Sequence, residues 1–205
     1  WTPRSTAPTS MRPRCVELSP SVGSLAPTQG AEPSYTIAGP EPADHGLGRS
    51  RGGVSSKVHQ LVDGKGRPLV IAVTAGQAGD STMLKPLLKH LAVHRLGPGR
   101  PRTRPDALLG DKAYSSRGNR ALLRAKRAKT VIPQPADQIG HRLRRGSAGG
   151  RPPAFDQTAY KGRNVIERSF NDHKQWRGIA TRYDKLAVVY RGGIVLRSVT
   201  IWLRQ

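Results

Sequence analysis

Two β-rich runs around a glycine turn constrain the fold more than any other feature of this chain. The runs are VSSKVHQLV (54–62) and PLVIAVTA (68–75), and the turn between them is DGKG (63–66). Runs of this kind with a short glycine-containing connection are typical of a β-hairpin. We therefore predict two antiparallel strands here, with Asp63 as a turn residue.

The segments after the hairpin alternate between helical and strand patterns. Residues 80–91 carry leucines at helical spacing after a candidate N-cap, Asp80 or Ser81. ALLGDKAY (107–114) has the pattern of a short buried strand that ends at Asp111. Further predicted elements are a helix near 116–127, a strand at 129–133, and helices near 157–175 and 184–203. This order predicts a mixed α/β sheet covered by helices.

Two basic loops and a weakly patterned N-terminal segment complete the chain. RLGPGRPRTRPD (95–106) and HRLRRGSAGGRPP (141–153) are predicted to be loops. Residues 1–45 are rich in Pro, Ser, Thr, Gly and Ala, and we expect them to be disordered or poorly packed. The folded domain would then cover residues 46–205. A single cysteine, Cys15, excludes an internal disulfide and a cysteine metal cluster.

The charge balance indicates a polyanionic partner. Lys and Arg number 35 against 13 Asp and Glu, which gives a net charge of +22. Such a chain repels itself unless a polyanion neutralises it, so nucleic acid is the expected partner and a membrane surface the weaker alternative. No segment has the roughly 18 consecutive apolar residues of a spanning helix, and no signal peptide opens the chain. We therefore expect a cytosolic protein without a membrane partner.

Four polar residues of the helix near 157–175 share one face. On an ideal helix that turns about 100° per residue, Tyr160, Arg163, Glu167 and Lys174 fall within roughly 60° of one another. A carboxylate on a packed helix and one at a strand end, Asp111, can converge. Such a pair can bind Mg²⁺ (or Mn²⁺) with few protein ligands and several waters, which suits phosphodiester chemistry. The pattern favours a nuclease-like protein.

The spacing of these four residues resembles a family signature. Tyr160, Arg163, Glu167 and Lys174 match in full the Y-(2)-R-(3)-E-(6)-K signature of DDE transposases from the insertion sequence four and five superfamily. The resemblance implies a ribonuclease-H-like fold and metal-dependent cutting and joining of element ends to target DNA. It covers about residues 41–205, through GRSRGGVSSKVHQLVDGKGRPL, GPGRPRTRPDALLGDKAYSS and NVIERSFNDHKQWRGIATRYDKLAVVYR.

The resemblance implies roles for individual residues. Asp111 corresponds to the second catalytic aspartate and Glu167 to the closing glutamate, and both would hold the metal. Arg163 and Lys174 would contact DNA phosphates near the cut, with Tyr160 supporting the same face. A nucleoid-associated bacterial protein is implied, and a homo-oligomer is left open. Further expected DNA contacts are Arg142, Arg144, Arg145 and Arg151 of the second basic loop, and Arg100 and Arg102 in PGRPR (98–102), which resembles the core of an AT-hook.

The family pattern requires a third carboxylate that this chain does not supply. It belongs on a central strand before the hairpin, in a segment resembling V-D-S-T, yet no aspartate precedes Asp44, which lies in a loop-like segment. Back-translated Trp1 and Thr2, read one nucleotide earlier, give a codon open to valine and then a forced aspartate codon. We therefore hypothesise that residues 1 to about 40 are a frameshifted reading and that the chain is a truncated or frameshifted copy. Its central strand would be missing or degraded, and the copy inactive.

Plainer interpretations remain for the same residues. Glu167 could be a surface glutamate paired with Arg163, an arrangement worth a few tenths of a kcal/mol. Asp111 could be a strand-end residue paired with Lys112 or a nearby arginine. His90 and His94 lie one helical turn apart, but no adjacent carboxylate completes a metal site, so we expect surface residues. The alternative function is that of a non-catalytic basic nucleic-acid-binding protein whose acidic residues are structural.

Overall fold

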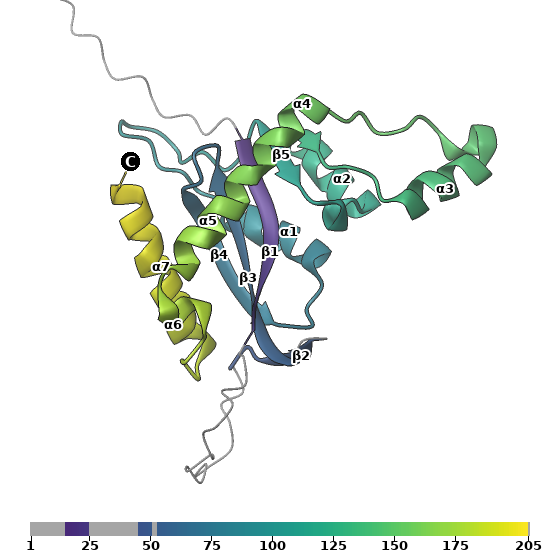
Figure 1. Cartoon of the computed structure of the whole chain (residues 1–205). Helices are drawn as coiled ribbons and strands as arrows, with labels where there is room; N and C mark the ends of the chain where they lie inside the picture. The colour runs from purple at the N-terminus through teal and green to yellow at the C-terminus, as the bar shows by residue number, and fades with distance from the viewer. Residues whose placement is uncertain (1–14, 25–44, 51–52, 205) are drawn as a thin grey trace, which may run out of the picture.

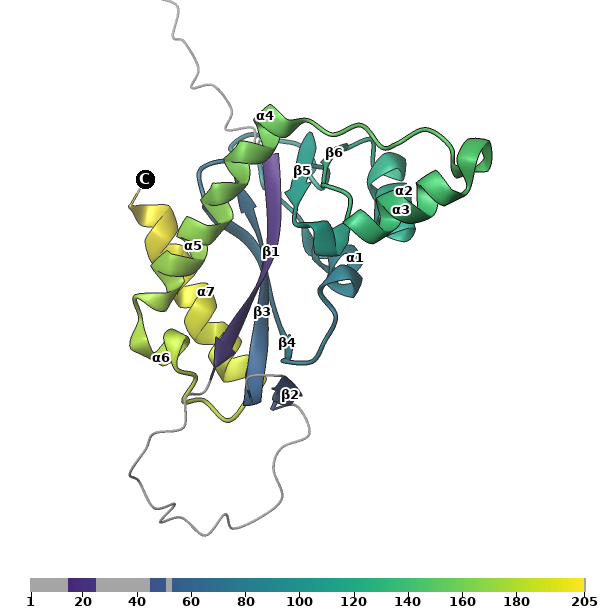
Figure 2. The same ribbon diagram turned by 45° about the vertical axis from the view of Figure 1, so that its right-hand side comes forward.

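The structure, a computed structural model, describes residues 15–24 (as backbone), 45–50 and 53–204. Its strands form one mixed sheet, and helices cover both faces of that sheet (Figures 1 and 2). The elements are β1 (Cys15–Ser24), β2 (Gly48–Ser50), β3 (Gly53–Asp63), β4 (Pro68–Ala75), α1 (Asp80–His90), β5 (Ala107–Gly110), η1 (Lys112–Tyr114), α2 (Arg117–Ala125), β6 (Lys129–Val131), α3 (Ala136–Arg144), η2 (Gly146–Gly149), α4 (Gln157–Tyr160), η3 (Lys161–Arg163), α5 (Asn164–Lys174), α6 (Arg177–Ala180) and α7 (Ala187–Leu203). The predicted mixed α/β class is confirmed.

The centre of the sheet is occupied by β1. It pairs antiparallel with β3, from Val16 opposite Asp63 to Ser24 opposite Ser55. On its other side it runs parallel to β5, which in turn runs parallel to β6. We predicted a missing or degraded central strand and expected residues 1–45 to be unpacked, whereas part of that segment forms this strand. The prediction of a missing strand is therefore not confirmed, and residues 1–14 and 25–44 lie outside the described part of the chain.

The predicted hairpin is present as β3 and β4, and its turn does more than reverse the chain. The Asp63 carboxylate accepts hydrogen bonds from the backbone N–H groups of Lys65 and Arg67, at 3.0 and 2.9 Å, and from Arg67 Nε at 2.7 Å. Gly66, at φ 88°, has the left-handed backbone that glycine adopts readily. The Arg67 guanidinium lies 4.3 Å from the centroid of the Trp202 ring. Asp63 is thus a turn residue that also ties the hairpin to α7.

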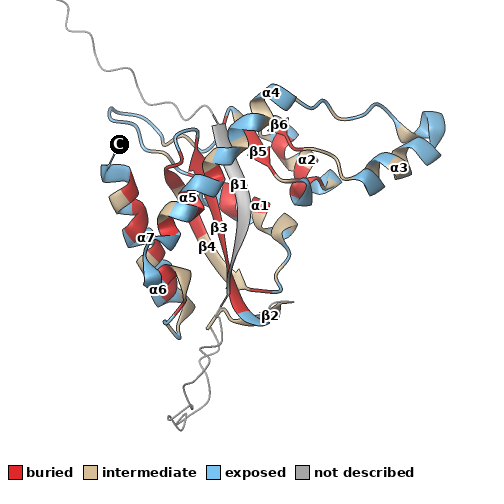
Figure 3. Ribbon diagram, in the orientation of Figure 1, coloured by how far each residue is buried: buried red, intermediate tan, exposed pale blue. Residues whose placement is uncertain are grey.

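Two apolar cores lie on opposite faces of the sheet. Side chains of a strand alternate between its faces, so β3 contributes Leu61 to one core and Val58 and Val62 to the other. The first core lies under α1 and the second under α5, α6 and α7 (Figure 3). The first contains mainly leucines, namely Leu61, Leu84, Leu87, Leu88, Leu91, Leu108 and Leu123; the second contains Val58, Val62, Ile71, Ile166, Phe170, Ile179, Tyr190 and Ile194.

Some predicted elements differ from the structure. The predicted loop at 141–153 is largely helical, because α3 and η2 cover most of it; together they form an arm that stands away from the sheet (Figure 1). No residue of α3 is buried (Figure 3). The single helix predicted near 157–175 is divided into α4, η3 and α5. Among the described residues, no helix is long and apolar enough to cross a bilayer.

Replacing Asp63 with alanine should destabilise the fold strongly. The side chains of Asp63 and Arg67 are only 3% and 8% exposed, so the substitution leaves a buried guanidinium without its counter-charge. We expect the free energy of unfolding to fall by about 3–5 kcal/mol in urea titrations. The matched control is Asp106→Ala, which breaks the exposed pair with Arg102 and should change it by less than about 1 kcal/mol. Equal effects of the two substitutions would contradict this account.

Candidate metal and DNA site

The helical run from α4 to α5 carries the signature residues. It begins at Asp156, whose carboxylate accepts a hydrogen bond from the Ala159 N–H at 2.9 Å. This N-cap bond and the Lys129 ammonium, 2.7 Å away, lower the pKa of Asp156. The backbone stays in the right-handed helical region at Tyr160 and Asn164, where the segments join. Residues 157–174 therefore present nearly continuous helical faces.

One face of α5 is anchored to the rest of the fold. Ile166, Ser169, Phe170 and His173 are its buried residues. His173 Nδ1 donates to the Ser169 carbonyl at 2.8 Å, and its Nε2 lies 3.0 Å from Ser198 Oγ on α7. Burial lowers the pKa of His173, which favours the neutral ring. Because this face is buried, the neighbouring residues of the helix face outward.

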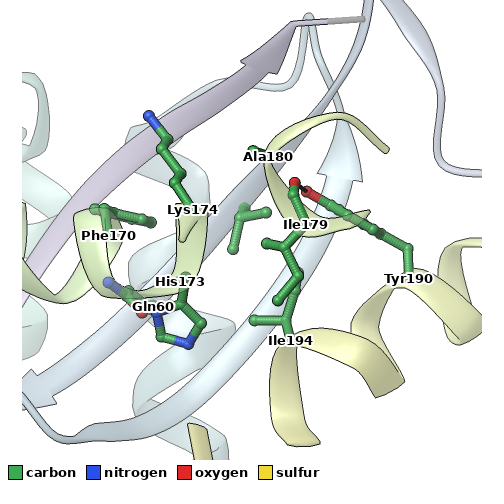
Figure 4. A pocket seen from close by; sticks show the side chains of 9 residues that line it. Gln60, Phe170, His173, Lys174, Ile179, Ala180, Tyr190 and Ile194 are labelled. Carbon is green, nitrogen blue, oxygen red and sulfur yellow. Dashed lines mark hydrogen bonds between the residues drawn. The ribbon is translucent and has the colours of Figure 1, made fainter. Parts of the chain in front are cut away.

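Three of the four signature residues contact one another on the outward face. Arg163 Nη1 donates to Glu167 Oε1 at 3.0 Å, and the Arg163 guanidinium lies 5.7 Å from the Tyr160 ring centroid. The Glu167 side chain is half exposed. Lys174 is also exposed, but it lies at the other end of α5, beside a small cavity (Figure 4). The structure thus joins Tyr160, Arg163 and Glu167 directly and places Lys174 apart from them.

Asp111 stands where β5 ends. Its carboxylate accepts a hydrogen bond from the Lys112 N–H at 2.6 Å and caps η1. Its backbone remains extended, at φ −68° and ψ 161°, so strand alternation places it on the same face as Leu109. That face is covered by η3, because a Cβ built on Gly162 would lie 3.8 Å from Leu109 Cδ2. Asp111 therefore belongs to the α5 side of the sheet.

A divalent cation such as Mg²⁺ binds oxygen ligands, above all carboxylates. No group of three or more His, Cys, Asp or Glu side chains suited to a metal ion occurs among the described residues. Asp111 and Glu167 are nevertheless hard oxygen donors on the same side of the sheet. Mg²⁺ is often held by only one or two carboxylates and keeps several waters. The donor chemistry of these two residues therefore fits Mg²⁺.

Gln60 lies on β3 in line with Ser19 of β1 and Asp111 after β5, in one row across the strands. Sequence reasoning missed it. Ser19 of β1 pairs with Gln60, while Leu18 pairs with Gly110, so Ser19 and Asp111 are the next residues of their two strands. Gln60 is fully buried and its carboxamide has no hydrogen-bond partner. It lines the cavity beneath α5 (Figure 4). The signal in the sequence was a glutamine between Val58 and Val62 on the same strand face.

The predicted basic contacts lie away from the two carboxylates. Arg145 and Arg151 are exposed on and after the arm, where Arg144 Nη2 lies 2.7 Å from His141 Nδ1. Arg142 is half-buried there, and its Nε has no hydrogen-bond partner.

Of the two arginines predicted to contact DNA in the other basic loop, one is engaged and one is exposed. Arg102 is engaged by Asp106 and donates from Nε to the Arg104 carbonyl at 2.9 Å, whereas Arg100 is exposed. His90 and His94 are exposed, as we predicted. Of the two arginines in PGRPR, Arg100 is therefore the one whose guanidinium is not engaged within the loop.

Comparison with known proteins assigns the chain to a family. Residues 26–196 match the transposase DDE domain family, so β1 precedes the matched span. A Brucella ovis protein named as a transposase for insertion sequence element IS6501 is 32% identical over 151 residues, which cover 74% of this chain and 100% of that protein. A Burkholderia cepacia protein named for IS402 is 30% identical over 152 residues, 74% of this chain and 62% of that protein. No solved structure matches. The chain belongs to the transposase DDE domain family.

Proposed function

We propose that this chain is the catalytic portion of an insertion sequence five type transposase with a ribonuclease-H-like fold. In an intact copy, the domain would cleave DNA strands at the ends of an insertion sequence and join them to target DNA. The observation that carries the proposal is the position of Asp111 and Glu167 on the α5 side of one sheet, within a chain of net charge +22. The names of the two relatives, both transposases for insertion sequence elements, support it.

Transposase DDE domains generally use divalent metal ions. In this chain Asp111 and Glu167 would hold Mg²⁺ or Mn²⁺, and the bound ion would supply positive charge to the scissile phosphate and its attacking and leaving oxygens. The carboxylates would orient that charge rather than attack phosphorus themselves. The chemistry of this donor set therefore fits phosphodiester cleavage.

Arg163 would couple DNA binding to the Glu167 carboxylate. Its guanidinium pairs with Glu167 and lies over the Tyr160 ring. A DNA phosphate competes for the same donors, and guanidinium binds phosphate in two parallel hydrogen bonds. We propose that phosphate binding draws Arg163 away from Glu167 and frees its oxygens for the metal, while Lys174 holds a more distant phosphate.

The arm formed by α3 and η2 would contact the DNA backbone without recognising the base sequence. Arg142, Arg144, Arg145 and Arg151 would bind the DNA backbone there, with Arg100 and Arg102 at the other basic loop. Such contacts position a protein on DNA and weaken as salt rises. A DNA substrate places the protein in the bacterial cytoplasm with the nucleoid, and a homo-oligomer could bring two element ends together.

We also propose that this copy cuts DNA poorly. The β1 position next to Asp111 is Ser19, so the row lacks an acidic residue between Gln60 and Asp111. The hypothesised frameshift over residues 1 to about 40 is a separate explanation for a lost carboxylate, because its aspartate codon would overlap Trp1 and Thr2 rather than Ser19. The nucleotide sequence of the gene tests it: the neighbouring frame should encode an Asp-Ser-Thr-like stretch there. Loss of one carboxylate weakens the metal site without removing the basic surface.

Substitution of either carboxylate should separate cutting from binding. We expect Asp111→Asn and Glu167→Gln to abolish any Mn²⁺-dependent nicking of supercoiled plasmid, because each removes a metal ligand. DNA affinity in filter binding should stay within about twofold of the parent, since neither substitution removes a phosphate contact. The exposed Glu167 pair should also contribute less than about 1 kcal/mol to stability.

The outcome of that experiment distinguishes the two candidate functions. Unchanged nicking in both variants would contradict the proposed metal site. Loss of DNA binding along with nicking would favour the alternative, a non-catalytic basic nucleic-acid-binding protein whose acidic residues are structural. The alternative is favoured by one observation, the pairing of Glu167 with Arg163.

Ser19→Asp should increase nicking. The substitution adds a carboxylate at the β1 position next to Asp111 and so supplies the third acidic residue of the row. We expect at least a tenfold higher rate of Mn²⁺-dependent plasmid nicking, roughly the effect of 1.4 kcal/mol on a barrier. Ser21→Asp is the matched control, because it adds the same charge about 7 Å further along the strand. An equal gain in both variants, or none in either, would contradict the proposal.

A further inference from the structure

The polarity of α7 is inverted relative to that of an ordinary surface helix. Its buried side includes Arg197 and Ser198, whose side chains donate to the carbonyls of Asp172 and Ile194. Its outward side is apolar, and half of the large apolar side chains that are exposed in the described part of the chain belong to this helix. A helix that borders water normally turns polar residues toward it, and a helix that is apolar all round is normally buried. The outward side of α7 therefore has the character of a covered surface.

The exposed residues of α7 form one continuous stripe. On an ideal helix that turns about 100° per residue, every α7 residue within an arc of roughly 140° is apolar or glycine. The main row repeats at intervals of three and four residues, as in the seam of a coiled coil, and consists of Val189, Gly192, Leu196, Val199 and Leu203. Beside it lie Val188, Val195 and Trp202. We call these exposed residues the α7 stripe.

Trp202 is fixed in place at one edge of the stripe. Its indole N–H donates to the Pro68 carbonyl at 2.8 Å, and the Arg67 guanidinium lies 4.3 Å from the ring centroid. The residue is nevertheless 37% exposed. Little side-chain entropy is lost when a partner covers a ring that is already fixed, and aromatic anchors of this kind are typical of protein interfaces.

The stripe is large enough for a specific interface. Its two leucines, Leu196 and Leu203, are 59% and 80% exposed, and its valines are between 41% and 61% exposed. These fractions correspond to roughly 600 Å² of exposed surface, the upper end of what a typical monomer shows in one patch. Two copies that cover each other's stripe would bury about 1,200 Å², the lower limit for specific protein–protein interfaces.

The spacing and the charge of the stripe suit a second copy of the same chain. The main row is self-complementary, because one seam can pack against an identical seam about a twofold axis. The stripe contains no charged residue, and Arg191 at its border donates from Nε to the Ile71 carbonyl at 3.1 Å, so a charged partner finds little to bind. Helices that lie on membranes carry Lys and Arg on their polar face, whereas the opposite face of α7 packs against the fold.

The position of α7 keeps most of the positive charge away from such a contact. In both views α7 lies at one side of the molecule and the arm formed by α3 and η2 lies at the other (Figures 1 and 2). Salt screens exposed charges beyond about 8 Å at physiological ionic strength. The arginines of the arm would therefore oppose pairing through α7 only weakly.

We propose that α7 is a homodimer interface, in which two copies of this chain bury their stripes against each other. The folded domain already holds each helix, so pairing requires no new helix to form. A Cβ built on Gly192 meets open space, so this position allows the two backbones to approach closely. The inference rests on the surface of α7 and does not depend on the proposed metal site.

Sedimentation equilibrium of the whole chain tests the pairing. Nuclease treatment and about 0.5 M NaCl prevent bridging by nucleic acid and screen the net charge of +22. Under these conditions the parent should form dimers with a dissociation constant in the micromolar range. Leu196→Asp should raise that constant at least about a hundredfold, because pairing would bury a carboxylate from each copy. A parent that stays monomeric at about 100 µM would overturn the proposal.

Leu143→Asp is the matched control for the substitution in α7. Leu143 is 63% exposed, close to the 59% of Leu196, but it belongs to the arm. The control should leave the dissociation constant unchanged, and equal effects of the two substitutions would overturn the assignment to α7.

Flotation with neutral phosphatidylcholine vesicles tests a lipid surface as the other occupant. Vesicle binding by the parent that Leu196→Asp abolishes would also overturn the proposal, whereas absence of binding supports it. None of these measurements uses metal or nicking, so they stand whether or not the proposed transposase function fails.

Discussion

The burial of Ile166 and Phe170 against Val58 and Val62 holds α5 to the sheet, and the candidate site depends on this contact. Because Ile166 points into the core, its neighbour Glu167 must lie at the edge of the buried face, where it meets Arg163. The same contact brings η3 over β5, the strand that Asp111 follows. An apolar contact therefore determines where both carboxylates stand.

Charge is arranged differently inside the fold and on its surface. The buried acid Asp63 is matched by Arg67 within the hairpin, and Asp80 by Lys57 at the start of α1. The excess positive charge is carried on exposed segments, above all on the arm, where α3 contributes nothing to either core. The buried arginines Arg182 and Arg197 are instead held by backbone carbonyls and neutral side chains, which satisfy the guanidinium donors without a counter-charge. Most of the net charge of +22 thus remains on exposed segments.

Local patterns in the sequence predicted the parts of the fold that depend on neighbours along the chain. The hairpin, α1, and the face shared by Tyr160, Arg163 and Glu167 follow from periodicity and turn chemistry. The strand β1 was missed although Val16, Leu18 and Val22 alternate with polar residues, because the Pro-, Ser- and Gly-rich composition around it indicated a loop and its pairing with β3 and β5 is long-range. The helix α3 was missed because glycines and arginines in the 141–153 stretch indicate a loop.

The position of Gln60 lay beyond sequence reasoning for a related reason. It is a polar residue in a buried position, and its environment exists only after strands and helices from distant parts of the chain have packed. The third carboxylate expected from the family signature was sought in the sequence and not found, and the structure has Ser19 at the corresponding place in the row. Under the proposed function, this position of the central strand is where the chain departs from the expected set of three carboxylates.

Anomalous diffraction from crystals soaked in Mn²⁺ would test the central claim most directly. The account predicts one Mn²⁺ peak on the α5 side of the sheet, with carboxylate oxygens of both Asp111 and Glu167 among its ligands. A peak held by other residues, or carboxyl groups of Asp111 and Glu167 that share no ion at saturating Mn²⁺, would contradict it.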